Sequence, residues 1–272
     1  MKKLVFTLAT CCIMCACEQK TETNPFFTEF RTEYGAPDFD KIKIEHYEPA
    51  FLKGIEEQNA EIKAIVESRE TPGFENTIVA LDNSGRTLAR VKGVFYALTE
   101  ADTNDEMSAL SEKIAPVLSE HNDNIYLNQD LYKRVAAVWQ QEQEGKITLT
   151  TEQHRLLDRY YKAFIRSGAG LDAGKQNRLR EINKELSTLA ITFSNHVLNE
   201  NNAYRLVIDN EAELAGLPEW VKTGAAEEAK AVGKEGKWLF TLQNSSRLPL
   251  LQYADNRELR KDIYEAYINR GN

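Results

Sequence analysis

The sequence has no cysteine beyond residue 17. All four of its cysteines precede that point, so the rest of the chain can hold no internal disulfide, cysteine-ligated metal or cysteine nucleophile. An exported protein without disulfides needs a hydrophobic core that is large enough to be stable without cross-links. We therefore expect one large domain or two small ones. The four cysteines are Cys11, Cys12, Cys15 and Cys17.

The sequence also has no dense run of lysine and arginine. Its formal net charge is −8, whereas contacts from basic side chains to phosphates supply most non-specific affinity for nucleic acids. An acidic chain without a basic cluster is therefore expected to have no nucleic-acid partner. After residue 17, no apolar run approaches the roughly 20 residues that a membrane-spanning helix needs.

Motifs that carry chemistry are absent as well. The sequence has no H-E-x-x-H, G-x-S-x-G, G-x-G-x-x-G or P-loop pattern. His196 and Glu200 could share one face of a helix, but a catalytic zinc needs three protein ligands, so both are interpreted as surface residues. His121 is expected near a helix C-terminus, and His46 and His154 are expected to be exposed in first turns. No catalytic or metal-binding residue is assigned.

The remaining candidates have structural interpretations. Carboxylates are numerous but scattered, and the pairs Glu56-Glu57 and Glu227-Glu228 are interpreted as solvated helix faces. The large aromatic residues are more typical of core or cap positions than of a ligand box. These aromatic residues are Trp139, Tyr160, Tyr161, Trp220 and Trp238.

The first 17 residues have the pattern of an export signal that ends in a lipid anchor. Lys2 and Lys3 precede the apolar run Leu4–Ala16, which is too short to span a membrane. The run ends in Met14-Cys15-Ala16-Cys17, which resembles the lipobox of bacterial lipoproteins, with methionine where leucine is usual. The resemblance implies a signal peptide at residues 1–16 and acylation of Cys17. It also implies a lipid-anchored location in the bacterial cell envelope, at its periplasmic or outer-membrane face.

An ordinary secretory signal is the alternative interpretation of these residues. In either case, loss of Lys2 and Lys3 changes the formal net charge from −8 to −10, because the removed segment carries two positive charges and no negative one.

A long amphipathic helix is predicted over Asp172–Asn202. Its apolar residues recur every three or four positions, which places them on one stripe of a helix. Asp172 is the expected N-cap, and the Asn201-Asn202 pair is the expected stop. A helix of roughly 28 residues, about 42 Å long, with one such stripe is interpreted as a spine against which other helices pack. The stripe consists of Leu179, Ile182, Leu186, Leu189, Phe193 and Val197.

Helical periodicity also covers most of the chain that precedes this spine. Capping boxes, with a hydroxyl at the N-cap and Glu or Gln three residues later, are expected at Thr103 and Thr150. Pro116 should kink its helix or begin a new segment. The aromatic-rich stretch Pro25–Asp40 is expected to lie on the body as extended chain. The predicted helices are 45–68, 74–101, one that opens near residue 103, 129–144 and 152–167.

After the spine the pattern changes to short β-like runs. Tyr204–Asp209 and Lys237–Gln243 could pair as a small antiparallel ribbon, with a helix near Glu219–Ala231 between them. A last helix is predicted over Asp255–Arg270, and its apolar side must fold back onto this chain. The abrupt end after this helix is interpreted as a sign of a fragment. The predicted fold class is a mostly α array with one spine helix and a minor two-stranded β ribbon.

Several stretches, spread from residue 49 to residue 218, form a specific combination. They include Phe74-Glu75-Asn76-Thr77-Ile78, Phe164-Ile165-Arg166-Ser167-Gly168-Ala169, the spine segment Leu179–Leu186, and Leu214-Ala215-Gly216-Leu217-Pro218. Together they resemble the N-terminal half of the peptidyl-dipeptidases (dipeptidyl carboxypeptidases) in the thimet-oligopeptidase-like family of zinc metallopeptidases. The match covers residues 24–272, nearly all of the chain after Cys17.

That resemblance implies a two-lobed and almost wholly α-helical peptidase that encloses a deep channel. Residues 17–40 would be a tether and arm, and residues 41–272 the N-terminal lobe that forms one channel wall. The implied activity removes dipeptides from the C-termini of short peptides. The implied zinc is held by two histidines and a later glutamate, with the motif glutamate as general base.

None of those zinc-site residues has a counterpart in this sequence, so the chain by itself is expected to be inactive. Its expected partners are short peptides, a C-terminal catalytic lobe and, through Cys17, a membrane. Without that lobe, the surface meant for the interface would expose more apolar area than a soluble monomer usually shows. One alternative is a free-standing helical envelope lipoprotein that binds peptides or a partner without catalysis. Another is a lipoprotein with a purely structural role.

Overall fold

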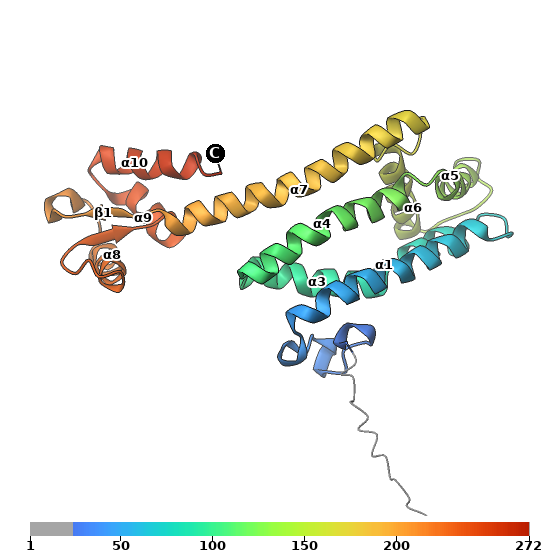
Figure 1. Ribbon diagram of the computed structural model, residues 1–272. Helices are drawn as coiled ribbons and strands as arrows, with labels where there is room; N and C mark the ends of the chain where they lie inside the picture. Colours follow the sequence, from blue (N-terminus) through green and yellow to red (C-terminus); the bar gives the residue numbers. More distant parts are fainter. Residues whose placement is uncertain (1–23, 272) are drawn as a thin grey trace, which may run out of the picture.

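The computed structural model describes residues 24–271 as a series of helices with one small β ribbon (Figure 1). The predicted signal peptide, residues 1–16, and the predicted lipid anchor, Cys17, lie outside the described residues. The mostly α fold class and the two-stranded ribbon are confirmed. No helix within residues 24–271 has both the length and the apolar character that crossing a membrane requires.

The N-terminal body (residues 24–169) is built from helices that meet in two hydrophobic clusters. One cluster joins α1, α5 and α6 around the buried side chains of Leu131, Leu157 and Phe164. The other joins α1, α3 and α4 around Phe51 and Phe95. The helices are α1 (Ile44–Glu67), α2 (Ala80–Asp82), α3 (Arg86–Ala101), α4 (Asp105–Tyr126), α5 (Gln129–Gln143) and α6 (Thr151–Arg166).

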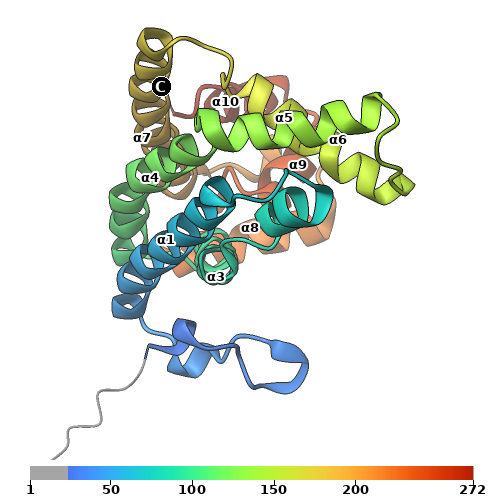
Figure 2. The ribbon, with the colours of Figure 1, turned by 90° about the vertical axis from the view of Figure 1, so that its right-hand side faces the viewer.

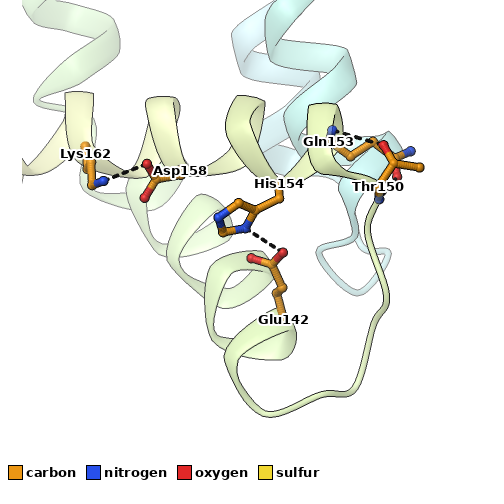
Figure 3. Close-up of polar contacts among 6 residues, drawn as sticks. All are labelled: Glu142, Thr150, Gln153, His154, Asp158 and Lys162. Atoms are coloured by element: carbon orange, nitrogen blue, oxygen red, sulfur yellow. Dashed lines mark hydrogen bonds and ion pairs between the residues drawn. The ribbon is translucent and has the colours of Figure 1, made fainter.

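The two capping predictions have different outcomes. At α6, the Thr150 backbone N–H donates to Gln153 Oε1 at 3.0 Å, and Thr150 Oγ1 accepts from the Gln153 N–H at 3.3 Å, so this capping box is confirmed (Figure 3). At α4, the predicted N-cap Thr103 is wrong. The N-cap is Asn104, whose Oδ1 accepts from the Met107 N–H at 2.9 Å. Asparagine caps at least as well as threonine, so the helix begins one residue later than the box predicts.

The helix predicted over residues 74–101 is interrupted. A π-helical turn at Phe74–Val79 leads into the short α2, and Gly85, with a φ of +72°, separates α2 from α3. This left-handed conformation ends helices and suits glycine, which has no Cβ. The Gly85 N–H donates to Glu61 Oε2 at 2.7 Å, which ties the break to α1. In contrast, α4 continues through Pro116 without beginning a new segment.

The prediction of extended chain is wrong for the N-terminal arm (residues 24–41). The arm folds into three short 3-10 turns at Pro25–Phe27, Glu33–Gly35 and Phe39–Lys41. Phe26 is fully buried, with its ring centroid 5.2 Å from that of Tyr47 on α1. The proline, glycine and aspartate residues of the arm favour turns, and burial of Phe26 fixes the start of the arm to the body.

Helix α7 (Ala173–Ala203) has 31 residues and joins the body to a C-terminal unit (Figure 1). Asp172 caps it as predicted, because its Oδ1 accepts from the Lys175 N–H at 3.0 Å. The predicted stop is wrong, since Asn201 and Asn202 both lie inside the helix. Asn201 Oδ1 instead accepts a hydrogen bond from Arg270 Nη1 at 3.1 Å. A tertiary contact therefore uses the side chain that the sequence pattern assigned to helix termination.

The C-terminal unit (residues 204–271) folds around the predicted ribbon. Strand β1 (Leu206–Ile208) pairs antiparallel with β2 (Trp238–Phe240), with Val207 opposite Leu239. Helix α8 (Glu219–Ala231) has the predicted bounds and packs against β2. Helix α9 (Asn244–Tyr253) is not among the predicted elements. Its internal Pro249 removes a backbone donor and argues against a helix interior.

Helix α10 (Arg257–Ile268) is the last element. Its Leu259 and Ile263 are buried in a third hydrophobic cluster that includes Phe240 and Leu250, so the apolar side folds back onto this chain as predicted. Tyr264, predicted on the same side, is 52% exposed. The third cluster is therefore closed by two of the four apolar side chains that the periodicity had grouped together.

Candidate functional site

Helix α7 contacts the body through polar side chains. Asn183 Nδ2 donates to Asp123 Oδ1 at 2.8 Å, and Asn195 Nδ2 donates to Glu112 Oε1 at 2.9 Å. Both acceptors belong to α4, and the two helices lie side by side (Figure 1). Hydrogen bonds between residues far apart in the sequence therefore define which face of α7 meets the body.

The predicted apolar stripe of α7 points away from α4. Leu186, Leu189 and Phe193 are 57%, 53% and 56% exposed. At about 3.6 residues per turn, these positions lie on nearly the opposite side of the helix from Asn183 and Asn195. No residue of α7 as described is buried. The prediction that other helices pack against this stripe is therefore wrong within residues 24–271. We call Leu186, Leu189 and Phe193 the apolar face of α7.

The C-terminal unit covers one end of this face. The Gly271 N–H donates to Glu200 Oε2 at 2.8 Å. A Cβ on Gly271 would lie 2.5 Å from the Phe193 ring and 2.9 Å from Val197 Cγ2, so the backbone approaches the helix very closely. The left-handed φ of +85° at Gly271 also suits glycine. This contact holds α7 and the end of α10 together while the apolar face stays open.

Tyr267 of α10 lies between two arginine side chains from different segments. The guanidinium carbons of Arg247 and Arg270 are 3.5 Å and 3.7 Å from its ring centroid, which is cation–π distance. Arg247 is only 7% exposed, and its Nη2 donates to Asn244 Oδ1 at 2.6 Å. The electron-rich ring offsets part of the cost of burying that charge. Sequence reasoning missed this cluster because no spacing rule relates α9 to α10.

Asp123 is a buried carboxylate at the contact between α4 and α7, with 5% exposure. Burial raises the pKa of Asp123, against the lowering effects of the hydrogen bond from Asn183 and the charge of Arg180. A carboxyl group with a raised folded-state pKa stabilises the fold below its unfolded pKa and loses that contribution as pH rises through the folded value. Asp123 therefore opposes folding at neutral pH, and Asn183 limits that cost.

His121 lies in the last turns of α4, as expected, but its side chain is buried at 6% exposure. Its Nε2 is 2.7 Å from Gln58 Oε1 of α1, while its Nδ1 has no partner among the described residues. Burial, and secondarily the charge of Lys92, lower the pKa of His121 below its usual 6.5. A neutral imidazole here links α1 and α4, and protonation would place an unpaired charge in the body.

This burial makes stability pH-dependent in a predictable direction. Because the folded-state pKa is lowered, protonation favours the unfolded chain, and the contribution of His121 is lost as pH falls from 6.5 through the folded value. We expect His121→Gln, which retains a polar contact to Gln58, to reduce the loss of unfolding free energy between about pH 7.5 and about pH 5.5. Urea unfolding of both chains at the two pH values measures this difference. Equal losses in both chains would contradict the assignment.

The exposed pair of His154 and Glu142 is the strongest candidate for a metal contact. His154 Nδ1 of α6 is 2.8 Å from Glu142 Oε1 of α5, and the His154 side chain is half exposed as predicted (Figure 3). A catalytic zinc needs a third protein ligand, and residues 24–271 contain no group of three or more His, Cys, Asp or Glu that could hold a metal. The described residues therefore do not fit the zinc that the resemblance implies, and no zinc-dependent step is assigned to them.

The other predicted histidines have local roles. His46 is part of the cap of α1, where its Nδ1 accepts from the Lys43 backbone N–H at 3.0 Å. His196 is exposed, as predicted, and with Asn195 and Glu112 it lines a polar groove of about 400 Å³ between α4 and α7. Glu200, predicted at the surface with it, is also exposed and binds the Gly271 N–H.

The predictions for carboxylates and aromatic residues are mostly confirmed. Glu56, Glu227 and Glu228 are exposed, and Glu57 is half-buried. The Trp139 ring stacks on Tyr161 with 4.4 Å between ring centroids, at the edge of the first cluster. Tyr160 is buried in that cluster, and Trp238 packs against the third one. The prediction is wrong for Trp220, which is 62% exposed on α8.

Comparison with known proteins identifies relatives over nearly the whole chain. Dipeptidyl carboxypeptidase of Escherichia coli (strain K12) is 39% identical over 246 residues, which are 90% of this chain and 36% of that protein. Oligopeptidase A of Salmonella typhimurium is 33% identical over 248 residues, 91% of this chain and 35% of that protein. The chain belongs to the thimet-oligopeptidase-like peptidases.

Saccharolysin of Saccharomyces cerevisiae is a more distant relative of this peptidase-family chain, with 25% identity over 203 residues, 74% of this chain and 28% of that protein. No protein-family model matches the chain. The chain spans about a third of the length of the curated relatives that it matches. The similarity therefore extends through the N-terminal body, α7 and the C-terminal unit, and does not extend to the remaining two thirds of those relatives.

Proposed function

We propose that this chain is the channel-wall lobe of a zinc metallopeptidase that releases dipeptides from the C-termini of short peptides. The observation that carries the proposal is its 39% identity, over 90% of its length, to a dipeptidyl carboxypeptidase. Zinc would be held by residues outside those described, because residues 24–271 contain no suitable ligand group. The lobe itself would admit unfolded peptides to the channel and exclude folded proteins by size.

The exposed apolar face of α7 supports this proposal. Soluble monomers rarely leave large contiguous apolar patches in water, and Leu186, Leu189 and Phe193 follow one another along one side of a helix. Because 246 residues are 36% of the E. coli relative, that relative is about 680 residues long. A polypeptide of that length would have roughly 430 residues beyond the matched part. We propose that a C-terminal catalytic lobe covers the apolar face.

We also propose that Cys17 carries the lipid anchor of this peptidase and holds it in the bacterial cell envelope. The lipobox-like Met14-Cys15-Ala16-Cys17 supports the anchor. The mass of the N-terminal peptide, isolated from membranes of the source cells, would test it. Acyl chains on Cys17 are the expected result, and an unmodified cysteine or a start elsewhere would refute the anchor.

The activity is tested with the complete gene product and an N-terminally blocked oligopeptide. We expect mass spectrometry to detect stepwise loss of C-terminal dipeptides, abolished by a chelator and restored by zinc. The 272-residue chain by itself should cleave nothing, and zinc-dependent cleavage by it would overturn the assignment of the lobe.

The size of the native protein is an independent check. An antibody against Asp172–Asn202, most of which is solvent-accessible, would detect it in lysates of the source cells. We expect a band more than twice the 31.0 kDa mass of this chain. A band near 31.0 kDa would rule out the catalytic lobe and favour the free-standing lipoprotein that binds peptides or a partner without catalysis.

A further inference from the structure

The N-terminal arm presents three aromatic side chains to solvent within 13 residues. Phe27, Tyr34 and Phe39 are 40%, 96% and 52% exposed. Single exposed apolar residues are ordinary, but a cluster of them marks an interaction surface. The arm is also the lowest described part of the molecule in both views, well away from α5, α6 and the apolar face of α7 (Figures 1 and 2).

The start of the arm is held firmly on the body. Arg90 Nη1 of α3 donates to the backbone oxygens of Phe26 and Thr28 at 3.0 Å and 3.2 Å. Asn24 Nδ2 donates to the His46 backbone oxygen at 2.7 Å. Together with the buried Phe26 ring, these bonds attach the arm to α1 and α3. The exposed rings are therefore carried by a positioned segment rather than by a free tail.

Tyr34 is held in a conformation that disfavours it. Its φ is +61° and that of Gly35 is +67°, and the Ala36 N–H donates to the Glu33 oxygen at 3.4 Å. These values describe a type I′ turn, whose first central position favours asparagine, aspartate or glycine. A tyrosine with a Cβ is strained there. A strained ring that buries nothing in the described chain points to a contact outside it.

We propose that Phe27, Tyr34 and Phe39 insert into the headgroup region of the membrane that carries the lipid anchor. Aromatic side chains favour this boundary because one part of the region is apolar and the other is hydrated. The inference rests on the proposed anchor at Cys17, which lies seven residues before Asn24. Seven residues span at most about 25 Å, so an anchored chain keeps the arm close to the bilayer.

The charge of the arm restricts the kind of contact. Residues 24–41 carry Glu29, Glu33, Asp38 and Asp40 against Arg31 and Lys41, a net charge of −2. Attraction to anionic lipids therefore does not hold the arm at the surface. The contact depends on the aromatic rings, so it should occur on zwitterionic lipid and depend little on salt.

The test uses the complete gene product made without residues 1–17, so that no acyl chain contributes, and phosphatidylcholine vesicles at millimolar lipid. Co-sedimentation of the wild type is compared with the triple variant Phe27→Ser, Tyr34→Asn and Phe39→Ser. A matched control replaces three residues exposed on the C-terminal unit, Trp220→Ser, Val232→Ser and Leu248→Ser. We expect a several-fold fall in the bound fraction for the arm variant and no change for the control.

The single variant Tyr34→Asn separates membrane contact from folding. Asparagine suits the left-handed turn position, so the unfolding midpoint should be equal to or above that of the wild type, while vesicle binding decreases. Equal binding by the wild type and the triple variant would overturn the proposal. So would binding that requires anionic lipid and disappears in salt, or loss of peptidase activity in the arm variant with unchanged vesicle binding. Acylation of Cys17 and peptide cleavage are measured separately, so failure of either is distinguishable from failure of this contact.

Discussion

Replacement of Leu186, Leu189 and Phe193 with serine should abolish the peptidase activity of the complete polypeptide and leave the 272-residue chain folded. The apolar face of α7 is more than half exposed in the described chain, so these changes remove little packing there. If a catalytic lobe covers the face, each side chain contributes roughly 1.5–3 kcal/mol of burial. The triple variant of the complete polypeptide should then lose about 4 kcal/mol or more of unfolding free energy.

Parallel denaturant unfolding and peptide cleavage by both forms measure this effect. The 272-residue chain should change by about 1 kcal/mol at most and should bind less of an apolar dye. A matched control replaces the exposed polar residues Arg178, Glu181 and Glu185 of the same helix with serine, and should affect neither form. Full activity and unchanged stability in the complete triple variant would show that another surface receives the catalytic lobe.

Gly54→Ala should destabilise the N-terminal body by about 3 kcal/mol, at the upper end of the usual cost of overpacking. Gly54 is buried on α1, where a Cβ would lie 2.8 Å from both the Cα and the backbone nitrogen of Leu88 on α3. These are backbone atoms, so the contact cannot be relieved by a change of rotamer. The two helices would have to separate along a contact that also buries Phe51 and Phe95.

A glycine on the facing helix provides the control. Gly93 lies inside α3, is exposed, and has no atom within 4 Å of where a Cβ would be placed. Gly93→Ala should therefore stabilise the fold by about 1 kcal/mol through helix propensity. Thermal and urea unfolding of the two variants should shift in opposite directions. Shifts of the same sign would mean that the close approach of α1 and α3 does not govern the response.

Elements were predicted best where local chemistry left one solution. Asp172 caps α7 and Thr150 caps α6, because each hydroxyl or carboxylate reaches a backbone N–H within its own first turn. Prediction was wrong at Thr103 because the adjacent Asn104 competes for the same role. Helix α9 was missed because Pro249 contradicts the propensity rules, although packing of Leu250 in the third cluster supports the helix.

The surfaces that could carry function were less predictable. The apolar residues of α7 were found from their spacing, but their exposure was not, because spacing does not name the partner of a helix face. The exposed Tyr34 and the buried Asp123 have the same origin, since both depend on contacts with residues distant in the sequence or on a turn type. The resemblance to peptidases was confirmed because it depends on residue identity, which needs no coordinates.

The sequence by itself therefore determined the helical fold class, the position of the ribbon and the relationship to the dipeptidyl carboxypeptidases and oligopeptidases A. Periodicity and residue identity are local properties of the chain, and they are read directly. The tertiary structure decided which side of α7 meets α4. Hydrogen bonds from Asn183 and Asn195 to carboxylates on α4 hold the polar side of α7 against the body. They turn the apolar face outward, because a helix cannot present both sides to one neighbour.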